Sequence, residues 1–589
     1  METKRTHTCG ELKKSNEGER VVLNGWVDSV RTYGSLQFVD LRDRYGITQT
    51  VFDESGGSDL LNRAKGLHLE YCVCISGTVR TRPEGQRNSE RSTGDIEVLA
   101  DGLKVFSRTR SQPFVIGDPE EPGEETRLKY RFLDLRREPM QKAMRVRSEV
   151  THSIRSFMEG EGFWDIETPA LGRSTPEGAR DYLVPSRVNR GKFYALPQSP
   201  QQYKQLLMVG GVDKYYQIAR CFRDEDPRAD RQPEFTQFDV EMSFADREDV
   251  LSMSERLLKR VFSEVMGIEL STPFPRMSHA QAVEKYASDK PDLRFGLEVT
   301  TLDELLRGTD FKVFKNVLQG GGTVRALAAP GAAEWSRKQI KELETVCTSS
   351  GAKGMAWLKY ISDEEFTGPI LKFFSAGKAL EMAKAMNANQ GDVLCFVADK
   401  KQTANACMHN LRNYIGRTFN LYDREEFHFL WIVDFPLFKW NEDEGRYDSE
   451  HHPFTAPIPQ DVAAFEQDKE LIPSASYDLV MNGLELASGS QRIHEPEVQS
   501  KVFEVLKLDE ETVRERFGFF IDALSYGTPP HAGIAFGLDR FVGLCLGHES
   551  IREVIAFPKN TRGIDMMNGA PGTVDREQLD ELGIELSED

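Results

Sequence analysis

The sequence has few cysteines and no long apolar run, and both absences limit what the protein can be. Its 589 residues include 8 cysteines and no CxxC pair, so neither a disulfide framework nor a zinc site is predicted. This cysteine usage fits a protein of a reducing compartment. No run of about 18 apolar residues is present, which argues against a helical membrane span. The first residues, METKRTHTCGELKK, lack the apolar core of a secretory signal. We therefore expect a cytoplasmic protein with no membrane partner.

The chain also lacks a phosphate-binding GxxxxGK[ST] loop and an excess of positive charge. The missing loop disfavours a P-loop enzyme, and Gly320–Gly322 lacks the strand and helix of a dinucleotide site. The formal net charge is -19, which at first argues against nucleic acid. Residues 1–110, however, hold 17 Lys and Arg against 16 Asp and Glu, a net of +1 that leaves -20 for the rest. The N-terminal part is therefore the part most compatible with phosphate.

Residues 20–105 read as short strands separated by turns. The pattern predicts a five-stranded barrel, with an OB-fold as the natural candidate. Arg31, Phe38, Arg42 and Gln49 mix charge, aromatic and amide groups across these strands, a combination that can stack a base and hold a backbone. A plain barrel with surface arginines would read the same way, so both interpretations stay open. The expected strands are 21–30, 36–41, 47–52, 71–79 and 96–105.

The most informative stretch is a predicted hairpin at residues 215–244. Its second half alternates strictly, and Gln237, Asp239 and Glu241 share one face with Phe235. A row of amide and acidic groups beside an aromatic is unusual for a solvated face. The hairpin therefore forms either the polar floor of a pocket or a charged surface feature.

Other segments add candidate polar groups. A helix is predicted after Ser199-Pro200, with Gln201 and Lys204 on one face. The adjacent histidines of HHPFTAP at 451–457 suit substrate contact or a surface loop better than zinc, because no third ligand follows at zinc spacing. Arg540 is expected where a strand passes into a helix.

Together these pieces resemble the class II aminoacyl-tRNA synthetases of the bacterial aspartyl type. Three motifs occur in the order of that family: a long helix ending at Glu167-Thr168-Pro169, the hairpin CFRDEDPRADRQPEFTQFDVE, and GLDR at 537–540. TPEGARDY, QSPQQYKQ, HHPFT and NGLELASGSQRIH match as well. The resemblance implies an α+β multidomain chain. Its expected parts are an OB-fold anticodon-binding domain (1–108), a linker or hinge (109–140), a catalytic antiparallel sheet in two parts (141–278 and 419–565), an inserted α/β domain (279–418) and a C-terminal extension (566–589).

The family joins aspartate to ATP, releases pyrophosphate and transfers aspartate to the 3' end of tRNA. The resemblance implies that Arg223 and Arg540 are the catalytic residues, with Arg223 on the α-phosphate and Phe235 stacked on adenine. Asp478 and Glu485 would hold Mg2+ on the triphosphate, a use of carboxylates that this ion favours. The implied ATP site comprises Arg223, Asp224, Glu225, Gln232, Phe235, Glu485, Gly537, Leu538, Asp539 and Arg540.

The resemblance also implies how aspartate is selected. Lys204 and Arg492 would pair with its side-chain carboxylate, and His451 would close over it. Asparagine would leave two buried cations without a counter-charge. Glu177, Gln237 and Asp239 would bind the ammonium, while Gln201 orients the substrate. The implied aspartate site is Glu177, Gln201, Lys204, Arg223, Gln237, Asp239, His451 and Arg492.

The barrel of this family reads the anticodon, and here the sequence departs from the pattern. The implied contacts are Arg31, Tyr33, Phe38, Gln49 and Gly85. An arginine-rich run is replaced by Ser-Val-Arg-Thr-Tyr at residues 29–33, and Gly85 stands where some members have Lys. These places resemble members that also charge the asparagine tRNA, which favours a relaxed enzyme acting on both tRNAs.

Two alternatives remain at the sequence level. An asparaginyl- or lysyl-type enzyme shares the barrel and motifs, but the Lys204 and Arg492 pair and the insertion argue against both. A non-catalytic tRNA-binding protein would not need Arg223, Glu485 and Arg540. The family further implies a homodimer built on the first motif, for which the apolar stripe at 144–158 is suitable.

Overall fold

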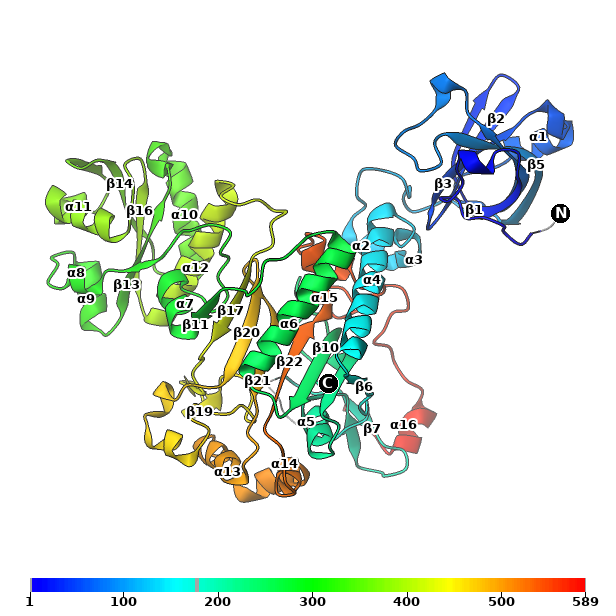
Figure 1. Cartoon of the computed structure of the whole chain (residues 1–589). Coiled ribbons are helices and arrows are strands. Elements are labelled where there is room, and N and C mark those ends of the chain that lie inside the picture. The colour runs from blue at the N-terminus through cyan, green and yellow to red at the C-terminus, as the bar shows by residue number, and fades with distance from the viewer. Residues whose placement is uncertain (1–2, 175–178, 588–589) are drawn as a thin grey trace. The chain divides into compact units, whose positions relative to one another are not determined.

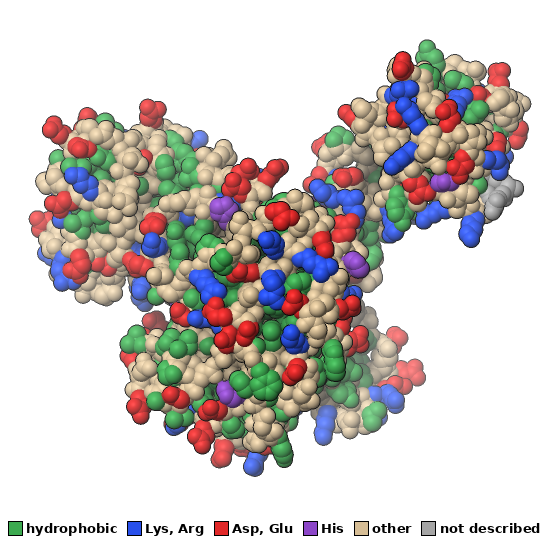
Figure 2. Space-filling model, viewed as in Figure 1, with side chains coloured by type: hydrophobic (Ala, Val, Ile, Leu, Met, Phe, Trp, Pro, Cys, Tyr) green, Lys and Arg blue, Asp and Glu red, His purple; other side chains and the backbone are tan. Residues whose placement is uncertain are grey.

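The computed structural model describes residues 3–174 and 179–587 (Figure 1). The chain divides into two compact units. One contains residues 1–145, 555–560 and 564–572; the other contains residues 146–554, 561–563 and 573–589. Within the described ranges, no helix is long and apolar enough to cross a membrane. Lys and Arg side chains are mixed with Asp and Glu over the visible surface (Figure 2).

The first unit begins with a closed five-stranded barrel, as predicted. Its order is β1-β2-β3-β5-β4, with β3 and β5 parallel and the other described neighbours antiparallel. The inward side chains, among them Val39, Leu41 and Phe52, are fully buried. This OB-type arrangement leaves the alternate side chains of β1, β2 and β3 outside the core. The elements are β1 (Arg20–Tyr33), β2 (Leu36–Asp43), β3 (Gly46–Phe52), α1 (Ser58–Lys65), β4 (Cys72–Thr81) and β5 (Ile96–Ser107).

Residues 109–140, expected to be a linker, contain two short helices, α2 (Glu124–Lys129) and α3 (Arg131–Asp134). The buried Asp134 accepts hydrogen bonds from Arg127 at 3.1 Å and from Arg131 at 2.6 Å. Arg131 also donates to the backbone carbonyl of Ile555. The buried ion pairs thus hold the two short helices together, and the Arg131 hydrogen bond joins them to residues 555–560 of the same unit.

The second unit is built on an eight-stranded sheet, in the order β11-β17-β20-β21-β22-β10-β9-β6. Its edge pairs β11–β17 and β6–β9 are parallel, and the six central strands are antiparallel. The strands are β6 (Trp164–Asp165), β9 (Lys214–Phe222), β10 (Glu234–Ser243), β11 (Arg276–Ser278), β17 (Phe429–Val433), β20 (Ser476–Met481), β21 (Leu484–Gln491) and β22 (His531–Gly537).

Alternation along β10 gives this sheet one apolar and one polar face. Phe238 packs against Phe536 at a ring separation of 5.6 Å. These rings meet Leu257 and Leu258 of α6 (Arg247–Val261) and Phe541 of α15 (Leu538–Cys545). Helix α4 (Glu138–Gly160) contributes Ile154 to the same contact. The opposite face, carrying Gln237, Asp239 and Glu241, is turned toward α5 (Gln201–Val209).

The inserted residues form a second sheet, in the order β12-β13-β16-β14-β15, with all pairs antiparallel. Helices cover both faces, so β16 is apolar from Val393 to Ala398. Val393, Cys395 and Val397 pack with α10 and α12, whereas Leu394 and Phe396 pack with α9 and α11. The elements are α7 (His279–Tyr286), β12 (Thr300–Thr301), α8 (Asp303–Leu306), α9 (Lys312–Gln319), β13 (Thr323–Ala329), α10 (Arg337–Ser349), β14 (Ala356–Ser362), β15 (Glu365–Thr367), α11 (Ala376–Ala385), β16 (Val393–Asp399) and α12 (Lys401–Thr418).

Smaller elements complete the second unit. They include two hairpins and three helices: β7 (Leu183–Pro185), β8 (Phe193–Ala195), β18 (Phe438–Asn441), β19 (Arg446–Ser449), α13 (Pro496–Val505), α14 (Glu510–Leu524) and α16 (Arg576–Leu582). An aromatic cluster joins Phe454 to rings that come from α13 and α14, namely Phe503, Phe517 and Phe520. This cluster supports the loop that carries His451 and His452.

Candidate active site

A cavity of about 570 Å³ lies against the polar face of the central strands. It gathers side chains that are hundreds of residues apart, from α5, β10, β21 and the β22–α15 junction. The predicted site residues that line it are Gln201, Lys204, Arg223, Glu225, Gln232, Phe235, Gln237, Asp239, His451, Glu485, Arg492, Gly537, Asp539 and Arg540. The hairpin formed by β9 and β10 is therefore the floor of a pocket.

Among the described residues, three of those predicted for the aspartate, ATP and metal sites do not line the cavity. Leu538 is buried on the apolar face with Phe541, because it begins helix α15 on that side of the sheet. Asp224 lies beside Arg180, with 3.7 Å between carboxylate and guanidinium. Asp478 lies behind His451, whose Nε2 is 3.2 Å from its Oδ1. Glu177 lies outside the described residues.

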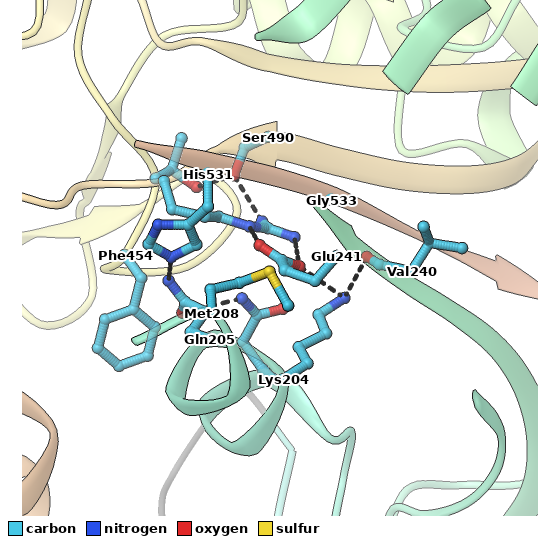
Figure 3. A network of polar contacts seen from close by, with 12 residues as sticks. Lys204, Gln205, Met208, Val240, Glu241, Phe454, Ser490, His531 and Gly533 are labelled. Atoms are coloured by element: carbon cyan, nitrogen blue, oxygen red, sulfur yellow. Dashed lines mark hydrogen bonds and ion pairs between the residues drawn. The ribbon is translucent and has the colours of Figure 1, made fainter. Parts of the chain in front are cut away.

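A buried group of two cations and two anions lies at one end of the cavity, where Lys204, Asp239 and Arg492 line it. Figure 3 shows Glu241 beside Lys204 in this group. Arg492 donates from Nε and Nη2 to the two carboxylate oxygens of Glu241, at 2.9 and 3.1 Å. Lys204 Nζ lies 3.0 Å from Asp239 Oδ1 and 3.4 Å from Glu241 Oε2. All four side chains are at most 1% exposed. Such a paired arrangement avoids the large penalty of an isolated buried charge.

The two acids of this group differ in their electrostatics. Burial raises the pKa of Asp239, although Lys204 opposes the effect. Burial also acts to raise the pKa of Glu241, but Arg492 and then Lys204 outweigh it and hold that pKa below its ordinary value. Glu241 is thus a firmly ionised partner of Arg492. The sequence placed Glu241 on the polar face but gave it no role.

Asp239 keeps hydrogen-bonding capacity for a ligand, whereas Arg492 already donates both of its Nη1 hydrogens. Within the described residues, Oδ2 of Asp239 is buried and has no hydrogen-bond partner. An acceptor of this kind suits an ammonium group. Arg492 directs Nη1 to Ser490 and to Nε2 of His452, at 2.6 and 2.8 Å. Burial, followed by the charge of Arg492, lowers the pKa of His452 well below its ordinary value, so this ring is neutral and accepts.

Small residues on β21 and β22 make room for Glu241. A Cβ atom on Gly533 would lie 2.0 Å from Oε2 of Glu241, and one on Gly489 would lie 2.3 Å from the carbonyl oxygen of Gly533. Neither approach is possible for a larger residue without a shift of the backbone or of the carboxylate. These glycines explain the small-residue runs ASGS and AGIAFG in the sequence.

A second chain of hydrogen bonds supports α5 from below. Gln201 donates to Oε1 of Gln205, and Nε2 of Gln205 lies 3.0 Å from Nε2 of His531. Burial lowers the pKa of His531, and its Nδ1 lies 2.9 Å from the carbonyl oxygen of Pro529. The neutral ring therefore donates from Nδ1 and accepts at Nε2. This chain fixes the helix face that presents Lys204.

The other end of the cavity is lined by arginines and an aromatic ring. The Arg223 guanidinium lies 5.0 Å from the centre of the Phe235 ring. Arg540 lies at the junction of β22 and α15, as predicted, and donates from Nη1 to the carbonyl oxygen of Glu485 at 2.5 Å. Its buried Nε has no partner in the described part of the chain. A flat group beside Phe235 and an anion between the two arginines would both find complementary surfaces.

The hairpin formed by β20 and β21 carries Glu485, which lines this end of the cavity, and Asp478, which lies behind His451. Asn482 and Gly483, at φ 52° and 82°, form its two-residue turn, the geometry that right-twisted hairpins favour. Burial and then the charge of Asp478 raise the pKa of Glu485. The described residues contain no cluster of three or more His, Cys, Asp or Glu able to hold a metal. Two carboxylates nevertheless suit Mg2+ when substrate phosphates complete its shell.

Three candidate nucleic-acid contacts, Arg31, Phe38 and Gln49, are neighbours on strands β1, β2 and β3, and Gln49 is buried. Arg31 is opposite Phe38 on neighbouring strands, and Asp40 is opposite Gln49. Arg31 donates to Oδ1 of Asp40 and to Oε1 of Gln49, at 3.2 and 3.1 Å. The buried Asp40 thereby orients an exposed arginine beside an aromatic ring, which the sequence did not predict. Tyr33 is 79% exposed and a Cβ on Gly85 would meet open space, so both remain accessible.

Comparisons with known proteins agree with this geometry. The family model "tRNA synthetases class II (D, K and N)" matches residues 123–561. The model "OB-fold nucleic acid binding domain" matches residues 21–106. Fold and site thus define a class II tRNA synthetase with an OB-fold nucleic acid binding domain.

Curated relatives narrow the class further. The chain is 50% identical over 585 residues to "Aspartate--tRNA(Asp/Asn) ligase" of Anoxybacillus flavithermus, covering 99% of each chain. It is 48% identical to "Aspartate--tRNA ligase" of Macrococcus caseolyticus, covering 99% of this chain and 98% of the relative. The protein belongs to the bacterial aspartate–tRNA ligase family.

A solved structure shares the fold at low identity. Asparaginyl-tRNA synthetase from Pyrococcus horikoshii, complexed with asparaginyl-adenylate, matches with a TM-score of 0.59 and 18% identity, covering 94% of this chain and 97% of that chain.

Proposed function

We propose that the protein activates L-aspartate with ATP to give aspartyl-adenylate and pyrophosphate, and then transfers aspartate to the 3' end of tRNA. The observation that carries this proposal is the buried group of Lys204, Arg492, Asp239 and Glu241 at one end of a cavity whose other end presents Arg223 and Arg540. One end suits an amino acid with two carboxylates, and the other suits a nucleotide. The reaction joins those two substrates.

Aspartate would be selected over asparagine by charge. Its side-chain carboxylate would approach Lys204 and Arg492, while its ammonium would meet the unpartnered oxygen of Asp239. Asparagine has nearly the same shape but no charge to offer the two cations. Because Asp239 and Glu241 already balance the two cations, asparagine loses only the two charge-assisted contacts that the carboxylate would make. Each is worth about 1.5–3 kcal/mol, which together give a discrimination of at least two orders of magnitude. His451 would close over the same group from its loop.

The chemical step requires positioning more than proton transfer. The α-carboxylate of aspartate attacks the α-phosphorus of ATP, the bond to the bridging oxygen breaks, and pyrophosphate leaves. Arg223 would stabilise the charge that develops on the α-phosphate, as a fixed cation in a desolvated site does. Phe235 would stack on adenine, with Arg540 on its far side or on the triphosphate. Glu225 and Gln232 would add contacts to ATP.

Asp478 and Glu485 are the residues that would hold Mg2+ on the triphosphate. Burial, followed by the charge of Asp478, raises the pKa of Glu485, and a bound cation would offset both effects. When bound, the ion would neutralise phosphate charge. Glu485 faces the cavity, whereas Asp478 contacts His451, so Glu485 is the better direct ligand.

The tRNA partner is proposed to be read by the barrel, with Phe38 stacking on a base and Arg31, Tyr33, Gln49 and Gly85 around it. Relatives carry the name "Aspartate--tRNA(Asp/Asn) ligase". That name and the departures at Tyr33 and Gly85 support action on both the aspartate and the asparagine tRNA. A homodimer formed through α4 and a cytoplasmic location complete the proposal.

The test is aspartate charging of purified aspartate and asparagine tRNA transcripts, side by side. Comparable charging of both is the expected result. Charging of the aspartate tRNA alone would reject the relaxed specificity and leave the synthetase function standing. Charging of neither, with ATP and Mg2+ present, would reject the function. Sedimentation of the same preparation tests the dimer.

A further inference from the structure

One cation of the cavity comes from the inserted residues, in which the sequence shows no catalytic pattern. Lys290 lines the same cavity as Glu485 and Arg540. Its Nζ lies 3.9 Å from Oε2 of Glu485. We propose that Lys290 binds the terminal phosphates of ATP and of the pyrophosphate that leaves. This inference rests on the proposed function, because it takes the Glu485 end of the cavity to be the triphosphate end.

The geometry leaves Lys290 free to serve a ligand. A separation of 3.9 Å is an ion-pair distance but too long for a hydrogen bond. The side chain is 41% exposed, and the structure, over the residues it describes, shows no hydrogen bond from Nζ. The Lys290 backbone N–H is held by Oγ of Ser288 at 3.1 Å. The main chain is thus fixed while the ammonium keeps its three donors.

A buried arginine of the inserted region anchors this segment. Arg412, on α12, donates to the backbone carbonyls of Asp292, Phe295 and Leu297 at 2.7, 2.8 and 2.6 Å. The Arg412 guanidinium also lies 4.2 Å from the centre of the Phe295 ring, and burial lowers its pKa to about 10. Burying a cation costs free energy unless hydrogen bonds compensate for the lost water. Here Arg412 fixes the loop that follows Lys290.

The same loop abuts the hairpin that carries Glu485. A Cβ on Gly483 would lie 3.0 Å from Cβ of Asp292, so the turn between β20 and β21 packs directly on the loop. Asp292 in turn accepts from Nε and Nη2 of Arg294, at 3.0 and 2.7 Å. The inserted region therefore sets the position of Lys290 relative to Glu485 through contacts on both sides.

The charge of Lys290 offsets the charge of the nearby Glu485 carboxylate. Glu485 places a carboxylate where a polyanion is to bind, with Asp478 behind His451, and a bare carboxylate repels phosphate. A lysine is a compact point charge that suits phosphate oxygens. Lys290 offsets Glu485 before ATP arrives and can pass to the phosphates when a cation occupies the carboxylates. Arg223, proposed for the α-phosphate, lies instead beside Phe235.

The experiment measures equilibrium binding of ATP and of AMP by calorimetry, at one fixed Mg2+ concentration, for the full chain and three variants. K290Q removes the charge and K290R keeps it. K285Q is the matched control, because Lys285 is a half-exposed lysine five positions earlier that pairs with Glu298 at 3.3 Å and does not line the cavity. Loss of a charge-assisted contact predicts that K290Q binds ATP about 10- to 100-fold more weakly.

AMP binding separates this proposal from general damage. K290Q should bind AMP as the unsubstituted protein does, and K290R should retain most of the ATP affinity. The inference is overturned if K290Q binds ATP as well as K285Q does, or if ATP and AMP weaken equally. If the unsubstituted protein itself fails to bind ATP, the proposed function fails instead.

Discussion

Replacement of Glu241 by glutamine tests the buried charge group directly. Glutamine keeps the shape of the side chain but removes the charge that both oxygens present to Arg492. Both side chains are at most 1% exposed, so water cannot replace the lost partner. Breaking a buried pair from one side lowers the free energy of unfolding by about 3–5 kcal/mol. Because Arg492 also loses its orientation, kcat/KM for aspartate should fall about a hundredfold or more.

The control for this change lies on the same strand. Glu234 pairs with Arg220 at 2.7 Å, but the two side chains are 35% and 46% exposed. An exposed pair of this kind contributes about 0–1 kcal/mol, so E234Q should be nearly silent. Urea denaturation and aspartate-dependent ATP–pyrophosphate exchange are measured for both variants. Equal behaviour of E241Q and E234Q in both assays would refute the role assigned to Glu241.

Three further predictions follow from the same structure. The pKa of Glu241 is below its ordinary value of 4.5, so the ionised carboxylate stabilises the fold above about pH 4.5, and this stabilisation is lost as the pH falls through the lowered pKa. The free energy of unfolding of E241Q should therefore not show this loss during acid denaturation. An acid denaturation curve equal to that of the unsubstituted protein would contradict the assignment. G533A should lower the free energy of unfolding by about 1–3 kcal/mol and impair aspartate activation, because the new Cβ would lie 2.0 Å from Oε2 of Glu241. G543A is the matched control in the same denaturation series, since its Cβ would lie 3.9 Å from the carbonyl oxygen of His548. F38A should raise KM for tRNA by the loss of about 1–3 kcal/mol of stacking without changing ATP–pyrophosphate exchange, and an effect on exchange would show that the barrel substitution disturbs the catalytic unit.

Local pattern was enough to predict many elements of this protein. The five strands of the barrel, the alternation along β10 and the position of Arg540 at a strand-to-helix junction all follow from periodicities of two to four residues. The structure confirms each of them. What the pattern left open was whether the polar face of β10 is solvated or buried. That choice depends on α5 and β22, which are distant in sequence.

The residues that the sequence missed act through long-range contacts. Glu241 received no role from the sequence, because its partner Arg492, which was predicted, lies 251 positions away and no local pattern indicates that the two residues pair. Lys290 lies in a segment without chemical pattern, and only the packing of Asp292 on the Gly483 turn brings it to the cavity. The sequence does not distinguish Asp40 from a surface acid, and only its contact with Arg31 in the structure shows its role. The runs of small residues in β21 and β22 were the sequence signal available for the close packing around Glu241.

Leu538 is a predicted ATP-site residue whose side chain the structure places on the apolar face. It belongs to the GLDR segment, so the resemblance included it with its neighbours in the ATP site. The first turn of α15 instead turns Leu538 into the apolar core beside Phe541, while Gly537, Asp539 and Arg540 line the cavity. A motif identifies a segment, whereas the helical turn decides which of its side chains reach the ligand.

The most direct measurement of the central claim is ATP–pyrophosphate exchange by the purified protein with aspartate, asparagine or lysine as the amino acid. The buried cations Lys204 and Arg492 predict exchange that depends on aspartate, with asparagine lower by at least two orders of magnitude in kcat/KM. Exchange with asparagine or lysine at a rate equal to that with aspartate would contradict the account of the pocket. Absence of exchange with all three would contradict the activity itself.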